Sequence, residues 1–142
     1  MAFRTRIRVR FGDEDHARIV YYPRLFHFFH VAFEDFFNEQ GHPYRHVIDV
    51  ERVGWPAVHV EADFEQAVRF GDELDVDVWV ARVGRSSATF AYRARRAGET
   101  QDVARARVTV ACIDMETFAP RPIPDAYREL FAQHGTQPID AR

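Results

Sequence analysis

The stretch Phe11–Phe37, FGDEDHARIVYYPRLFHFFHVAFEDFF, joins an acidic loop to the most apolar segment of the chain. Pro23 suits the first turn of a helix, where a backbone N–H would have no internal acceptor. The apolar residues that follow recur at helical spacing: Leu25, Phe28, Phe29, Ala32, Phe36 and Phe37. Gly41 and Pro43 end the pattern. The sequence therefore predicts one long helix over about residues 23–38, with an aromatic face.

Three acids, Asp13, Glu14 and Asp15, stand shortly before this helix. Aspartate is common in turns and near helix N-termini, so any one of these acids can be structural. A helix N-terminus also offers N–H groups that lack internal acceptors, and such donors can hold the oxyanion of an acyl-transfer reaction. A carboxylate beside them can attack a carbonyl carbon or activate water. The stretch is therefore a candidate hydrolytic site.

Alternating apolar and polar residues predict five strands. They fall near residues 4–11, 57–68, 74–81, 87–97 and 103–114. The turns between the later strands are short and contain Gly71, Gly84 and Gly98, which favours an antiparallel sheet. Because one apolar helix must be covered, we expect an α+β fold in which this five-stranded sheet wraps around the central helix. A short second helix is expected over residues 125–134.

Composition narrows the class of protein. The 142 residues carry a net charge of −3, and all 19 basic residues are arginine, so no strongly basic footprint for nucleic acid is present. No apolar run is long enough to span a membrane, and the first residues do not resemble a signal peptide. The single cysteine, Cys112, lies in an apolar run and indicates a buried thiol in a cytoplasmic protein. We expect a single domain over residues 1–142.

Arginine alternates with apolar residues near the start of the chain. Arg4, Arg6, Arg8 and Arg10 share one parity, and Thr5, Ile7, Val9 and Phe11 share the other. This alternation predicts a strand with a solvated arginine face and a buried apolar face. Further along the chain, His27 and His30 are neighbours on the predicted helix, but no third ligand stands at helical spacing, so no metal site is expected.

The segment FGDEDHARIVYYPRLFHFF resembles the signature of the 4-hydroxybenzoyl-CoA thioesterase family of hotdog-fold enzymes. In that signature Asp-x-Asp-x-x-Gly-x-Val precedes an aromatic residue and the central helix. Three further segments are similar to the family and occur in the same order: VGWP at residues 53–56, FGDEL at 70–74 and GRSS at 84–87. The resemblance covers roughly residues 4–115, and its order of strands and helix equals the predicted one.

The resemblance implies that Asp15 is the catalytic carboxylate, acting as nucleophile or general base on a thioester. It also implies that the backbone N–H of Tyr22 binds the thioester oxygen. The substrate would be an acyl-CoA or aroyl-CoA thioester, with CoA as part of the substrate and no other cofactor. The site would lie at a subunit interface of a homo-oligomer, a dimer or a tetramer. Tyr21, Tyr22 and Pro23 favour the aroyl-CoA branch of the family.

The family's usual glycine is Arg18 in this chain, so we expect the loop to be built differently here. Arg18 can reach a CoA phosphate or point into water, and His30 can contact the polar end of the acyl group or pack in the core. Glu61 can contact the site or belong to a solvated strand face. Arg85 and Ser86 can bind the CoA nucleotide or form an ordinary hairpin turn.

Two other functions fit the same features. One is a thioesterase for acyl groups carried by acyl carrier protein. The other is a non-catalytic acyl-CoA-binding hotdog domain, for which Arg18 in place of glycine is the supporting feature. A serine hydrolase is not expected, because no Gly-x-Ser-x-Gly elbow occurs. A hotdog dehydratase is not expected either, because no histidine-bearing Gly-Pro loop precedes the helix.

Overall fold

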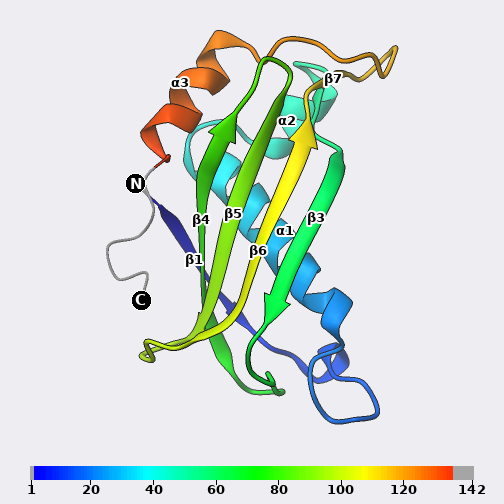
Figure 1. Ribbon diagram of the computed structural model, residues 1–142. Coiled ribbons are helices and arrows are strands. Elements are labelled where there is room, and N and C mark those ends of the chain that lie inside the picture. Colours follow the sequence, from blue (N-terminus) through cyan, green and yellow to red (C-terminus); the bar gives the residue numbers. More distant parts are fainter. Residues whose placement is uncertain (1, 136–142) are drawn as a thin grey trace.

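A computed structural model describes residues 2–135, which form a twisted sheet with a long helix across one face (Figure 1). The sheet has five strands in the order β1-β4-β5-β6-β3, and every neighbouring pair is antiparallel. The strands are β1 Phe3–Arg8, β3 Ala57–Phe64, β4 Glu73–Val83, β5 Ser87–Arg96 and β6 Asp102–Ala111. The expected α+β fold with a five-stranded antiparallel sheet is therefore confirmed.

The long helix α1, Tyr22–Glu39, agrees with the predicted 23–38 to within one residue at each end. Its buried face consists of Leu25, Phe28, Phe29, Ala32, Phe33, Phe36 and Phe37. This face packs against the inward-facing side chains of the sheet. For example, the rings of Phe33 and Phe36 contact the ring of Phe90 on β5. Apolar burial on this scale is the main driving force for the fold. It fixes the direction in which α1 crosses the sheet.

Five smaller elements complete the described structure. They are the 3₁₀ turn Phe11–Asp13, α2 Tyr44–Asp49, β2 Val53–Gly54, β7 Ile113–Asp114 and α3 Asp125–Gln133. The helix α3 matches the expected 125–134 closely, and its Phe131 packs on Phe37 and Phe90. The helix α2 was not expected. It has six residues and only Val47 is buried in it, so it lacks the apolar repeat that identifies longer helices.

The sequence predicted that the side chains of Phe11 and Cys112 are buried, and the structure agrees for only one of them. Phe11 was expected on the buried face of the first strand, which is wrong: its side chain is 80% exposed. The strand ends at Arg8, and Phe11 begins a single 3₁₀ turn and contacts the exposed ring of Phe70 instead. Cys112 is buried as predicted, and burial raises the pKa of its thiol.

Strand β3 forms one edge of the sheet and is the most exposed strand in it (Figure 1). It pairs with β6 on one side only. Val58, Val60 and Phe64 are 63%, 44% and 45% exposed. A long, exposed, apolar edge strand is a template for pairing with another chain.

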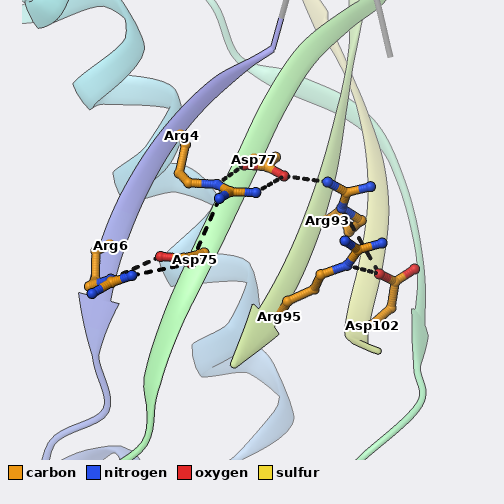
Figure 2. Close-up of polar contacts among 7 residues, drawn as sticks. All are labelled: Arg4, Arg6, Asp75, Asp77, Arg93, Arg95 and Asp102. Atoms are coloured by element: carbon orange, nitrogen blue, oxygen red, sulfur yellow. Dashed lines mark hydrogen bonds and ion pairs between the residues drawn. The ribbon is translucent and has the colours of Figure 1, made fainter. Parts of the chain in front are cut away.

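The arginines of β1 face the acids of β4 across the outer face of the sheet (Figure 2). The Nε atoms of Arg4 and Arg6 lie 2.7 Å from Asp77 Oδ1 and 2.9 Å from Asp75 Oδ1. Arg8 continues the row with Glu73 at 2.9 Å. The predicted arginine face is therefore real, but its side chains form ion pairs and are only partly solvated.

Asp77 also holds the most deeply buried cation of the sheet. Arg93 of β5 is 2% exposed, and its Nη2 lies 2.6 Å from Asp77 Oδ2 (Figure 2). On the same face, Nε of Arg95 lies 2.8 Å from Asp102 Oδ1. A buried guanidinium needs a compensating charge, because removing one partner of such a pair leaves the other uncompensated.

We expect Asp77→Asn to lower the free energy of unfolding by about 3 kcal/mol, because the buried Arg93 then loses the carboxylate 2.6 Å from its Nη2 and keeps Asp102 only at 4.0 Å. The matched control is Glu73→Gln in the exposed Arg8 pair, for which we expect a much smaller change. Urea denaturation of both variants measures the difference. Equal losses would contradict this account of the outer face.

Candidate active site

The loop with the three acids lies at the end of the sheet where α1 begins (Figure 1). Asp13 is the buried acid of the loop, with 4% exposure. Its Oδ2 accepts the backbone N–H of Arg10 at 2.8 Å, and its Oδ1 accepts Nη2 of Arg24 at 2.7 Å. Its carbonyl oxygen accepts the N–H of Tyr21 at 3.0 Å. Asp13 therefore ties the loop to the first turn of α1 and is a structural residue.

Glu14 has a structural contact as well. Its carboxylate accepts the backbone N–H of Phe70 at 2.9 Å, which fastens the loop to the turn before β4. Glu14 also forms an isolated antiparallel bridge with Val20. This bridge closes residues 15–19 into a short excursion that returns directly to the start of α1.

Asp15 is the exposed acid of the three. One carboxylate oxygen accepts the N–H of Ala17 at 2.8 Å, and its own N–H donates to the carbonyl of Ile19 at 3.0 Å. No arginine pairs with Asp15 among residues 2–135, unlike Asp13. Its second carboxylate oxygen is therefore available to a substrate or a water molecule.

The first turn of α1 provides the donors that the sequence predicted. Tyr21 caps the helix without a side-chain hydrogen bond, and no acid stands in the first turn. The N–H of Arg24 donates to the carbonyl of Tyr21, Pro23 has no N–H, and within residues 2–135 the N–H of Tyr22 has no acceptor. A free N–H at a positive helix end is suited to an anionic oxygen.

Arg18 adopts the left-handed backbone conformation, with φ of 66°. The expectation that this loop is built differently without glycine is therefore wrong. Arg18 takes the kind of conformation for which glycine is preferred, and the turn is closed by the hydrogen bond from its N–H to the carbonyl of Asp15 at 3.0 Å. Its side chain is exposed, and no described acid pairs with it.

A cavity of about 640 Å³ lies between α1 and the inner face of the sheet, and it begins one helical turn beyond Tyr22. It is lined by Phe26, Phe29, His30, Phe33, Trp55, Pro56, Ala57, Val60, Tyr92, Val108 and Val110. Phe64 connects the helix start to the cavity, since its ring contacts both Tyr22 and Phe26. The size and the aromatic walls suit a flat apolar group.

His30 lines this cavity, and its Nε2 lies 2.6 Å from Glu34 Oε2. The structure thus places His30 with the cavity rather than with the acidic loop. Tyr92 also lines the cavity, and the sequence analysis did not identify it. On β5 its side chain points to the same face of the sheet as the core residues, so the alternation pattern does not distinguish it from them. The only available signal was a phenolic hydroxyl on an otherwise apolar strand face.

The other predicted residues lie elsewhere in this chain. Glu61 is exposed on the outer face of β3, where its Oε2 lies 3.2 Å from Nε2 of His59. Arg85 and Ser86 form the turn between β4 and β5, at the opposite end of the sheet from α1's first turn (Figure 1). Arg128 donates to the carbonyl of Arg85, and Cys112 donates to that of Ser86. A single chain does not bring these three residues to Asp15.

Neither a metal cluster nor a membrane helix is found in the part of the chain that the structure describes. Residues 2–135 contain no group of three or more His, Cys, Asp or Glu side chains that could hold a metal ion. No helix in the same range is long and apolar enough to cross a membrane.

Comparisons with known proteins agree with this geometry. The sequence profile of the thioesterase-like superfamily matches residues 9–131. A 1,4-dihydroxy-2-naphthoyl-CoA hydrolase of Synechococcus elongatus is 30% identical over 122 residues, which cover 85% of this chain and 88% of the relative. The acyl-CoA thioesterase YbgC of Haemophilus influenzae is 25% identical, with 88% and 90% covered. The crystal structure of a 1,4-dihydroxy-2-naphthoyl-CoA thioesterase from Synechocystis superposes with a TM-score of 0.86 at 23% identity, covering 96% of this chain and 100% of that one.

The fold and the family match define a hotdog-fold thioesterase. The chain belongs to the thioesterase-like superfamily. The fold and the family that the opening segment indicated are both confirmed.

We expect Arg18→Gly to raise the free energy of unfolding by about 1 kcal/mol, because a left-handed conformation costs a non-glycine residue roughly that much. Ala17→Gly is the control, since φ at this neighbour is not positive. Glycine there only raises the conformational entropy of the unfolded chain, which lowers the free energy of unfolding. Thermal and urea denaturation distinguish the two. A loss of stability in Arg18→Gly would mean that the arginine side chain makes a contribution that outweighs its backbone strain.

Proposed function

We propose that this protein hydrolyses an aroyl-CoA or acyl-CoA thioester to the free acid and CoA. The observation that carries the proposal is the exposed carboxylate of Asp15 beside a helix N-terminus with a free N–H, which leads into an aromatic cavity. Relatives named as hydrolases of 1,4-dihydroxy-2-naphthoyl-CoA and as acyl-CoA thioesterase support the reaction class.

The residues divide the chemistry between them. The thioester oxygen accepts the N–H of Tyr22, which polarises the carbonyl and stabilises the oxyanion. Asp15 either attacks the carbonyl carbon directly or takes a proton from the attacking water. The tetrahedral intermediate then collapses, the C–S bond breaks, and CoA leaves as a thiolate that takes up a proton. If water is the attacking group, the free acid forms in this step. If Asp15 is the attacking group, a mixed anhydride forms on Asp15, and water then hydrolyses it to the free acid and restores the carboxylate. Water is the only co-substrate, and CoA enters as part of the substrate.

The cavity favours an aromatic acyl group. Phe26, Phe29, Phe33 and Tyr92 place aromatic rings on both its helix side and its sheet side. Rings prefer offset or edge-to-face contacts with other rings, so a flat aroyl group fits better between them than a flexible chain. The substrate proposed is therefore an aroyl-CoA thioester in the first place.

Assembly through β3 belongs to the same proposal. Two copies of the exposed edge strand can pair antiparallel, which removes the unpaired edge and covers Val58, Val60 and Phe64. Antiparallel pairing reverses the second copy, so its turn at Arg85 and Ser86 comes to the end that carries Asp15 here (Figure 1). Such a dimer, alone or within a tetramer, supplies the cationic and hydroxyl groups that a CoA nucleotide needs, with Glu61 close to the joint.

We expect Asp15→Asn to lower kcat at least 100-fold with benzoyl-CoA, 4-hydroxybenzoyl-CoA and 2-naphthoyl-CoA, since it removes the attacking or proton-accepting group. The melting temperature should change little, because the asparagine keeps the oxygen that accepts the Ala17 N–H and no ion pair to Asp15 is lost. Free-thiol release measures the first and thermal denaturation the second.

The control is Asp13→Asn, whose carboxylate pairs with Arg24 and is buried. This variant should lose stability, whereas Asp15→Asn should lose turnover without losing stability. Full thiol release by Asp15→Asn would refute the assigned role. Thiol release only from acyl carrier protein thioesters would mean that the protein performs the same hydrolysis on acyl groups held by that carrier.

We also expect Val58→Glu to convert the oligomer to monomers and to reduce thiol release in parallel, because two like charges then meet across the β3 joint. Sedimentation velocity and the thiol assay are run on the same samples. Arg82→Glu, on an exposed position of β4 away from the edge, is the control. A fully active monomer would contradict the assembly part of the proposal.

A further inference from the structure

One exposed aromatic ring, that of Phe118, stands apart from the others. It lies in the loop between β7 and α3, is 65% exposed and contacts no other ring within residues 2–135. The other exposed phenylalanine and tyrosine rings of this range each contact a second ring, namely Phe11, Tyr21, Tyr22, Phe64 and Phe70. A single exposed ring needs no explanation by itself, so the conformation and the place of its loop decide what it means.

The loop holds Phe118 in an unfavourable backbone conformation. Its φ is 59°, in the left-handed region that a bulky residue rarely adopts. The N–H of Phe118 donates to the carbonyl of Asp114 at 2.7 Å, and the N–H of Asp114 donates to the carbonyl of Ala119 at 2.9 Å. Asp114 Oδ1 also accepts the N–H groups of Glu116 and Thr117 at 2.8 and 3.1 Å. The tip is therefore well fixed, and a strained conformation that is maintained in this way indicates a function.

The tip of this loop projects past the edge strand β3 (Figure 1). Residues 115–120 follow β7 and reach farther out than β3, on the side away from β6. They lie at the end of the sheet opposite to the first turn of α1 (Figure 1). Two copies that pair antiparallel through β3 are related by a two-fold axis perpendicular to the sheet, so the two ends change places. The tip of one copy therefore comes to the acidic loop of the other.

An exposed aromatic surface lies at the place that the tip reaches. Tyr21 and Tyr22 are 51% and 59% exposed, and their ring centroids are 5.6 Å apart. The ring of Tyr22 also lies 6.0 Å from that of Phe64, the last residue of β3, which places the tyrosine pair beside the β3 joint. A further ring packs favourably on such a pair in an edge-to-face or offset arrangement.

The charges beside the two surfaces are complementary. Glu116, two residues before Phe118, is exposed and forms no ion pair within residues 2–135. Arg18, three residues before Tyr21, is likewise exposed and without an acidic partner in the same range. Opposite charges across an interface determine its register and its partner more than its strength. An acid on the tip and an arginine on the acidic loop therefore favour one way of docking two copies.

We propose that residues 115–120 dock on the acidic loop of a second copy of this chain. In this contact Phe118 packs against the two exposed tyrosines, and Glu116 lies beside Arg18. The inference rests on the assembly within the proposed function and identifies a second contact of that assembly. The N–H of Tyr22, the proposed oxyanion donor, then lies behind a ring from the second copy. A hydrogen bond to the substrate is stronger where water is excluded, so each copy completes the site of the other.

The aromatic contact is tested by sedimentation velocity on Phe118→Gly. Glycine removes the ring and also suits the left-handed conformation, so the fold should be retained, which the circular dichroism spectrum checks. We expect the dissociation constant of the dimer to rise at least about tenfold, because an aromatic side chain buried in an interface contributes strongly to association. A dissociation constant equal to that of the wild type would overturn the contact.

The charged contact is tested by charge reversal. Glu116→Arg and Arg18→Glu should each raise the dissociation constant of the dimer about tenfold, because like charges then meet. The double variant should return it to within about threefold of the wild type, since opposite charges face each other again. Glu129→Arg is the control: it reverses an exposed acid on α3, away from β3, and should change nothing (Figure 1). A double variant that associates no better than the single variants would contradict the contact.

Failure of the proposed function gives a different result. A wild-type dimer that releases no thiol from any CoA ester would refute hydrolysis, and the dissociation constants would still support or reject the docked loop. A wild-type dimer whose association is unaffected by Phe118→Gly and by both charge reversals would keep the β3 assembly and reject the docked loop. A wild type that sediments as a monomer at every concentration would reject the assembly and the docked loop together.

Discussion

The burial of the aromatic face of α1 against the inner face of the sheet is the constraint on which the other features depend. Phe29, Phe36 and Phe37 are almost fully enclosed, so the helix cannot shift along the sheet without exposing them. Its first turn therefore emerges at a fixed end, where the bond between Asp13 and Arg24 holds the acidic loop beside it. Toward the exposed edge strand β3 the packing is incomplete, and the 640 Å³ cavity remains. The core thus determines both where the free helix donors lie and where a ring can enter.

The three consecutive acids have different surroundings, which explains why the loop needs all of them. Asp13 is neutralised by Arg24 and fixes the helix start, while Glu14 holds the turn before β4. Both oxygens of Asp13 and one oxygen of Glu14 accept these hydrogen bonds. Asp15 is held through its backbone and through one oxygen, so its position is defined while its charge stays accessible. A catalytic carboxylate requires this combination, since it has to be placed accurately and still be free to react.

Much of this could be predicted from the sequence, and the exceptions have physical reasons. The helical spacing of the phenylalanines predicted α1, and the alternation of apolar and polar residues predicted the strands of the sheet. Both predictions were possible because the spacing of apolar residues directly reflects which side chains are buried. The ion pairs of the outer face depend on register: Asp77 meets Arg4 only because β1 pairs with β4, which lies almost seventy residues further along the chain. Arg18 misled the prediction because one residue type says little about backbone conformation when arginine can adopt φ of 66° at modest strain. Tyr92 was not predicted as a cavity residue, because the sequence does not distinguish an inward tyrosine in the core from one in a cavity wall.

The candidate site can be recognised as the set of groups that the fold itself does not use. The outer face is dense with charge, yet Asp77 and Arg93 form an ion pair there, and elsewhere the buried Tyr127 donates its hydroxyl to Glu51. The second carboxylate oxygen of Asp15 and the N–H of Tyr22 have no such partner within residues 2–135. Both lie at the start of α1, which continues along the aromatic cavity. The proposed function assigns to these two groups the attack on the thioester and the binding of its oxygen, and both roles require groups that the fold leaves unused.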